Sequence, residues 1–181
     1  MKEFFEVGKP GYFLLILAFV GCIAALIYLR NGKKRSKQAG NTADAYKVMT
    51  EAYLTQVADD KLVNEVIKNL MDKLARRHPD PLITIPKLSH GRNAVYFTWM
   101  LVKEVEHNGA ESLKKKPACR FNDVGLEGLV AVGAERSAET VRAFLAGDAT
   151  AQDAEQALAE ELPLSLCVEY IRSHTDEFID E

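Results

Sequence analysis

Residues 11–29 read GYFLLILAFVGCIAALIYL and carry no charged side chain. A helix rises about 1.5 Å per residue, so this run would be about 28 Å long, close to the hydrocarbon thickness of a bilayer. Tyr12 and Tyr28 lie near its two ends, where aromatic rings favour the membrane interface. The run predicts a transmembrane helix over residues 11–30, after a short tail of residues 1–10.

Basic residues on the two sides of this run predict its orientation. Only Lys2 and Lys9 precede it, whereas a denser group follows it: Arg30, Lys33, Lys34, Arg35 and Lys37. Because positive residues accumulate on the cytoplasmic side of a membrane helix, we expect the N-terminus outside and the rest of the chain in the cytoplasm. The pattern is typical of a single-pass protein of a bacterial inner membrane.

Two processed forms are alternatives for the apolar run. A cleaved signal peptide has a shorter apolar region and a small-residue cleavage site, whereas this run continues to Leu29 and ends in positive charge. The letters FVGC, ending at Cys22, are similar to a lipoprotein processing box, but lipidation there would leave IAALIYL at the new N-terminus. A membrane helix agrees better with the run. Within it, Gly21 and Ala25 have a spacing that lets a second membrane helix approach closely.

Residues 31–42 read NGKKRSKQAGNT, which is polar, basic and interrupted by glycine. This composition predicts a flexible linker. Its basic side chains, those of Lys33, Lys34, Arg35 and Lys37, can rest on anionic lipid headgroups at about 1 kcal/mol each, or serve only as a stop-transfer signal. Both interpretations stay open. Residues 43–181 are then expected to form one cytosolic domain.

Cysteine and histidine residues are few and scattered. The cysteines form no C-x-x-C pair, so neither a disulfide framework nor a zinc site is indicated: Cys22, Cys119 and Cys167. The histidines form no H-E-x-x-H motif: His78, His90, His107 and His174. His107 follows Glu104 and Glu106, but a histidine at a helix end commonly bonds to helix carbonyls instead of moving protons. We expect no enzyme, no cofactor and no metal site.

Apolar residues after the linker recur with the helical period, and no alternating strand pattern of useful length occurs. A first helix is expected from Asn41 or Thr42 to about residue 57. A second, capped by Asp59 or Asp60, has a continuous apolar face over residues 62–74. The prolines that follow it predict an extended connector: Pro79, Pro81 and Pro86.

The remaining sequence predicts five more helices, and hence an all-α domain of about seven. Ser89 can cap a helix over residues 91–107 that is apolar around much of its circumference and is expected at the centre of the fold. Asn108 and Gly109 can form a left-handed turn that ends it, and Gly133 ends a short helix that begins near residue 122. Later helices are expected to end at residue 147, to span residues 150–162, and to begin at Pro163.

Three stretches of the chain read AVYFTWMLVKEVEHNGA, GLEGLVAVGAERSAETVRAFLAG and EYIRSHTDEF. In this order they resemble parts of a bacterial all-helical domain family of unknown function that includes a DNA-mimic protein. The resemblance extends over roughly residues 94–178 and implies the all-α fold. The matching positions are Glu104, Val105, Asn108, Gly109, Gly133, Ala134, Tyr170, Ile171, Arg172, Glu177 and Phe178. Residues 110–116, AESLKKK, depart from the family's pattern of aromatic residues and glutamine after its Asn-Gly-Gly turn.

Charge is distributed unevenly along the chain. Residues 121–181 contain 3 Lys and Arg against 14 Asp and Glu. Carboxylates held on rigid helices can imitate a phosphate array and attract a basic, nucleic-acid-binding protein, although most acidic surfaces only keep a domain soluble. Net negative charge also argues against direct nucleic-acid binding. The interaction candidates are Glu155, Glu160, Glu161, Glu169, Asp176 and Glu177.

Two functions of different classes follow from these observations. The first is a membrane-anchored, acidic helical domain that binds a protein partner, in a regulatory or scaffolding role. The second is an accessory subunit of a larger membrane complex, in which Gly21 and Ala25 pack against other transmembrane helices.

Overall fold

The computed structural model describes residues 48–180, and the predicted membrane helix and linker lie outside them. The described residues form eight α-helices and four short 3-10 helices, without a strand, so the predicted all-α fold is confirmed. The elements are α2 (Glu51–Gln56), α3 (Asp59–Arg76), α4 (Pro81–Thr84), η2 (Ile85–Lys87), α5 (His90–Asn108), η3 (Ala110–Lys114), η4 (Ala118–Phe121), α6 (Asn122–Ala131), α7 (Glu135–Ala146), α8 (Ala151–Glu161), α9 (Pro163–Ser173) and η5 (Thr175–Phe178). Within residues 48–180, no helix has the length and apolarity required to span a bilayer.

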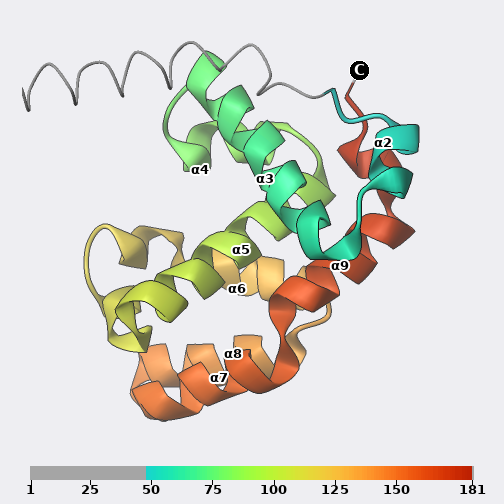
Figure 1. Ribbon diagram of the computed structural model, residues 1–181. Helices are drawn as coiled ribbons and strands as arrows, with labels where there is room; N and C mark the ends of the chain where they lie inside the picture. The colour runs from blue at the N-terminus through green and yellow to red at the C-terminus, as the bar shows by residue number, and fades with distance from the viewer. Residues whose placement is uncertain (1–47, 181) are drawn as a thin grey trace, which may run out of the picture. The chain divides into compact units, whose positions relative to one another are not determined.

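Helix α5 lies at the centre of the described domain (Figure 1), as its apolar circumference predicts. It contacts α3, α6, α8 and α9, and Phe97 in its middle is fully buried. Ser89 is its N-cap and accepts a hydrogen bond from the Arg92 amide at 3.2 Å. Trp99, further along α5, is half-buried and packs against the core.

Two glycines end helices where the sequence predicts. Helix α5 ends at Asn108, and Gly109 has a φ of 74°, a value that residues with a Cβ atom rarely adopt. After α6, Gly133 has a φ of 86°, and the amide of Ala134 donates to the Leu129 carbonyl at 2.8 Å. That bond closes the helix end in a Schellman-type turn.

The segment between α3 and α5 corrects a prediction. Instead of an extended connector, residues 81–87 form α4 and η2. Asp80 caps α4 by accepting from the Leu82 amide at 3.1 Å, and Pro81 occupies the first turn, where its missing N–H costs nothing. Pro81 and Pro86 each stand in the first turn of a short helix and not in a helix interior, whereas Pro79 lies between α3 and α4.

Two predicted helix starts are also wrong. Residues 48–50 are not helical, and α2 begins after Thr50, whose side chain accepts from the Tyr53 amide at 3.2 Å. Helix α3 has Ala58 as its N-cap, without a side-chain bond. Asp59 and Asp60 lie in its first turn, where their negative charges interact favourably with the positive end of the helix dipole. The apolar face of α3 is buried as predicted, except for the exposed Met71.

The segment 110–116, which departs from the resembled family, begins with the 3-10 helix η3. Ala110 and Leu113 are buried in the main core, so the segment contributes packing as well as its exposed lysines. Thr150 and Asp153 form a capping box at the start of α8, and Pro163 is in the first turn of α9.

Candidate functional site

Two large hollows open on the described domain. One, of about 510 Å³, is mainly apolar and lies between the end of α5 and the junction of α8 with α9. The other, of about 490 Å³, is polar and lies where the end of α3 meets the start of α5 and the C-terminal segment. We call the second hollow the cationic cleft, because the basic residues that line it outnumber the acidic ones: Lys73, Arg76, Arg77, Lys87 and Arg92 against Asp176, Glu177 and Asp180.

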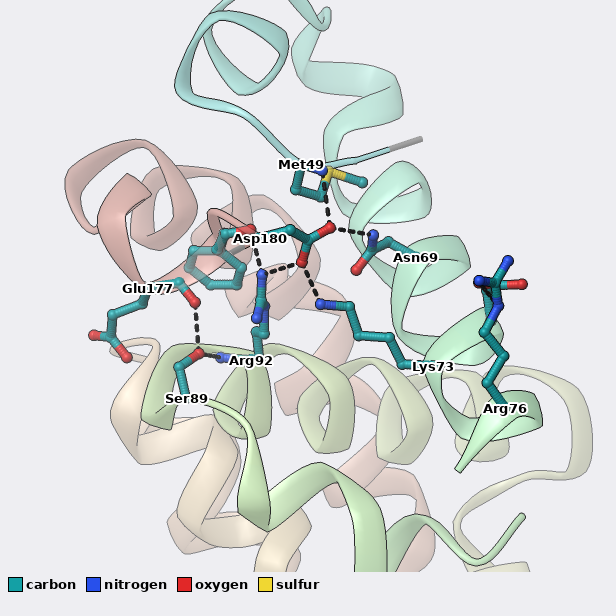
Figure 2. A network of polar contacts seen from close by, with 10 residues as sticks. Met49, Asn69, Lys73, Arg76, Ser89, Arg92, Glu177 and Asp180 are labelled. Carbon is teal, nitrogen blue, oxygen red and sulfur yellow. Dashed lines mark hydrogen bonds and ion pairs between the residues drawn. The ribbon is translucent and has the colours of Figure 1, made fainter. Parts of the chain in front are cut away.

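The carboxylate of Asp180 forms the inner wall of the cationic cleft. Its side chain is 4% exposed and accepts hydrogen bonds from four donors, which lie on three separate segments (Figure 2). These are the Met49 amide at 3.0 Å, Asn69 Nδ2 at 3.0 Å, Arg92 Nη2 at 2.7 Å, and Lys73 Nζ. The amide of Asp180 in turn donates to the Met49 carbonyl at 2.7 Å. The last described residue therefore joins the beginning of the domain to α3 and α5.

Arg92 extends this network along the C-terminal segment. It is 8% exposed, and its Nη2 donates to the Phe178 carbonyl at 2.6 Å as well as to Asp180. Ser89 Oγ donates to the Glu177 carbonyl at 2.6 Å, and the Glu177 carboxylate accepts from the Gly91 amide. The start of α5 is thus bonded to three of the last four described residues.

The pKa of Asp180 lies below its ordinary value. Burial alone would raise it, but the hydrogen bonds from Lys73, the Met49 amide and Asn69, together with the charge of Lys73, lower it by more. Asp180 is consequently ionised and pairs with the two least exposed cations of the cleft, Lys73 and Arg92.

Three of the predicted interaction residues make contacts within the domain. Glu161 accepts from the Arg136 and Ser137 amides at 3.2 and 2.6 Å, so it caps the start of α7 from the end of α8. Glu155 accepts from the Ala110 amide at 2.8 Å. Glu160 pairs with Arg136 at 2.7 Å and accepts from Gln156, and these donors lower the pKa of its carboxyl group.

The other three predicted residues lie elsewhere. Asp176 and Glu177 line the cationic cleft, and Glu177 is bound to the start of α5. Glu169 is exposed on α9. The structure therefore does not bring the six candidates together on one surface: three help to hold α7, α8 and η3 in place, and two belong to the cleft.

Two of the candidates, Glu169 and Asp176, and five carboxylates that the sequence did not single out have no such contacts within the described residues. Within residues 121–180, several are exposed and have no side-chain hydrogen bond or ion pair: Asp123, Glu127, Glu135, Glu139, Asp148, Glu169 and Asp176. Of the basic residues in the same range, Arg136 pairs with Glu160 and Arg172 with Asp59, which leaves Arg142 exposed. We call Glu127 of α6 and Glu135 and Glu139 of α7 the acidic surface, because α6 and α7 are in contact.

The histidine and cysteine side chains stand apart from both hollows. His107 Nδ1 bonds to the Lys103 carbonyl at 2.7 Å, as a histidine at a helix end does. His174 stacks on Tyr170 with ring centroids 4.3 Å apart. Burial raises the pKa of the Cys167 thiol to about 12, so it stays protonated and unreactive. Among residues 48–180, no three His, Cys, Asp or Glu side chains are placed to hold a metal ion.

The cationic cleft was not predicted from the sequence. Its cations come from the end of α3, from η2 and from α5, and no local motif marks them as a group. Comparison with models of protein families, with curated proteins and with solved structures gives no match for this chain, so the family resemblance stays a prediction.

Proposed function

We propose that the chain is a single-pass membrane protein that presents an acidic helical domain to a basic protein partner at the cytoplasmic face of a bacterial membrane. The role is regulatory or scaffolding, and a nucleic-acid-binding protein is the kind of partner whose charge fits. The uncharged run of residues 11–29 and the basic residues after it support the anchor and its orientation.

The acidic surface carries the proposal. Glu127, Glu135 and Glu139 are exposed on two helices in contact and form no ion pair within residues 48–180. Carboxylates on rigid helices keep their spacing when a partner arrives, so little ordering is required on binding. Such a surface accelerates encounter with a positively charged partner, and salt weakens the effect. The anchor would add to binding by raising the effective concentration of the domain near a partner at the membrane.

The orientation is tested in spheroplasts that contain the full-length chain. A protease added outside should leave residues 43–181 intact, because they are expected behind the membrane, and should digest them after lysis. A C-terminal tag detected by immunoblotting reports the result, and a periplasmic protein serves as the control for protease activity. Digestion of the domain in unlysed spheroplasts would contradict the proposed topology.

The acidic surface is tested by affinity purification of the full-length chain in mild detergent. Glu135→Gln with Glu139→Gln should reduce the yield of the partner by about tenfold at low salt, since two charges that steer the encounter are removed. The matched control is Glu51→Gln with Asp60→Asn, which removes two exposed charges from the first turns of α2 and α3. Equal yields from the two double variants would contradict a role for the acidic surface.

An accessory subunit of a membrane complex is the second candidate, and the apolar hollow favours it. Leu162, which lines that hollow, is 57% exposed, and an apolar side chain so exposed is typical of a contact surface. In the same purification, a partner lost from Gly21→Leu with Ala25→Leu, but retained by the Glu135 and Glu139 variant, would favour this second function. A partner retained by a chain without residues 1–40 would favour the first.

A further inference from the structure

The cationic cleft opposes the charge of the domain around it. Residues 48–180 contain 15 Lys and Arg against 22 Asp and Glu, yet five of those cations and three carboxylates line this one hollow. The hollow has a net positive charge, whereas the excess of carboxylates elsewhere in the domain would repel an anion. Its charge is therefore a property of this site and not of the surface in general.

The partners of the lining residues divide the cleft into a wall whose cations are already paired and a rim whose cations are not. Lys73 and Arg92, at the wall, both pair with Asp180 (Figure 2). Arg76 pairs with Asp72 at 2.9 Å. Arg77 and Lys87 are exposed, and among residues 48–180 their side chains have no hydrogen bond or ion pair. The Glu177 carboxylate is engaged by the Gly91 amide, so Asp176 is the one lining carboxylate without a donor from the described residues.

We propose that the cationic cleft binds a small phosphate monoester through Arg77 and Lys87. A phosphate monoester carries up to two negative charges and several acceptor oxygens, which suits one guanidinium and one ammonium on the same rim. The volume of about 490 Å³ exceeds the needs of inorganic phosphate and admits the organic part of a small ester. The two cations of the inner wall are already bonded to Asp180, so recognition depends on the unpaired cations of the rim.

The cleft also adjoins the point at which the chain enters the domain. Met49 is among the first described residues and bonds in both directions to Asp180, which lines the cleft. The phosphate group can come from a lipid headgroup or from a soluble ester. This inference does not depend on the acidic surface or on a protein partner.

The test uses the full-length chain in phosphatidylcholine nanodiscs and glycerol 3-phosphate as the soluble probe, with phosphorus NMR as the readout. A second set of nanodiscs contains phosphatidic acid, whose headgroup is the same phosphate monoester held in a membrane. We expect saturable binding in at least one set, weakened about tenfold by Arg77→Gln with Lys87→Gln. Both residues are exposed, so thermal unfolding followed by circular dichroism should match that of the unaltered chain.

Lys61→Gln with Lys68→Gln is the matched control, since it removes two exposed cations from α3 outside the cleft. This variant should bind as the unaltered chain does. Binding of glycerol 3-phosphate in phosphatidylcholine nanodiscs would assign the cleft to soluble esters, and binding of phosphatidic acid alone would assign it to a lipid headgroup. Equal weakening by the two double variants, or no saturable binding in either set, would overturn the proposal.

Discussion

Replacing Asp180 by alanine should lower the free energy of unfolding by about 3–5 kcal/mol, the cost of leaving buried charges without their partner. The Asp180 side chain is 4% exposed, and those of Lys73 and Arg92 are 12% and 10% exposed. Without the carboxylate, two cations face each other in a poorly hydrated site, and Asn69 and the Met49 amide lose an acceptor. Urea unfolding followed by circular dichroism measures the change.

The control is Glu160→Ala, which removes an ion pair whose side chains, Arg136 and Glu160, are 64% and 43% exposed. An exposed pair of this kind contributes little to stability, because water screens it. A loss from Asp180→Ala no larger than that from Glu160→Ala would show that the network at the C-terminus does not stabilise the domain.

The stability of the domain should also depend on pH through Asp180. The pKa of Asp180 in the folded protein is below its ordinary value of 3.8, so its contribution to stability is fully present above that value. The contribution is lost as the pH falls through the lowered pKa, since the unfolded chain then binds the proton more readily. The Asp180→Ala variant should therefore lose less stability than the unaltered chain over this acidic range.

Replacing Gly128 by alanine should lower the free energy of unfolding by about 2–3 kcal/mol, as overpacking does. A Cβ atom at this position would lie 2.8 Å from the Ala94 carbonyl oxygen and 2.9 Å from Thr98 Oγ1. The first of these atoms belongs to the backbone of α5, so α5 and α6 would have to separate. This cost exceeds the roughly 1 kcal/mol that alanine gains over glycine in a helix.

Gly125→Ala, one turn earlier on α6, is the matched comparison. Its Cβ would lie 2.7 Å from Leu101 Cδ1, the end of a flexible side chain that can change rotamer. We expect a smaller loss than for Gly128→Ala, because the backbone of α5 can stay in place. The reverse order in a thermal unfolding experiment would contradict close contact of the α5 and α6 backbones as the reason for glycine at position 128.

Local signals account for the elements that were predicted correctly. Ser89 caps α5 through the amide three residues later, and Thr150 and Asp153 cap α8 in the same way. The apolar residues of α3 recur at the helical period within that one helix. Each of these features depends on residues within a turn or two of one another, so the sequence pattern and the structure carry the same information.

Local sequence features also gave a wrong prediction in one segment. The three prolines between α3 and α5 predict extended chain, although Asp80 stands directly before Pro81 and is a suitable N-cap. An aspartate followed by proline is as consistent with a helix start as with a connector. The start of α2 was likewise placed before Thr50, which is the residue that caps it.

Long-range contacts explain what the sequence could not predict about the sites. Glu161 looked like a free surface carboxylate, but it caps α7 through amides 24 and 25 residues away. Asp180 meets Lys73 and Met49 across 107 and 131 residues of chain. The packing of the helices decides which carboxylates bond to other segments and which stay free. That packing cannot be predicted from neighbouring residues.

The sequence by itself determined the helical class, the uncharged run at residues 11–29, the acidic last third, and the helix ends at Gly109 and Gly133, because period, charge and backbone freedom are properties of neighbouring residues. Only the tertiary structure decided that the C-terminal segment is bonded to the start of α5, and that Arg77 and Lys87 line one hollow. The physical reason is distance along the chain: hydrogen bonds and ion pairs between segments form only after the core around α5 has brought those segments together.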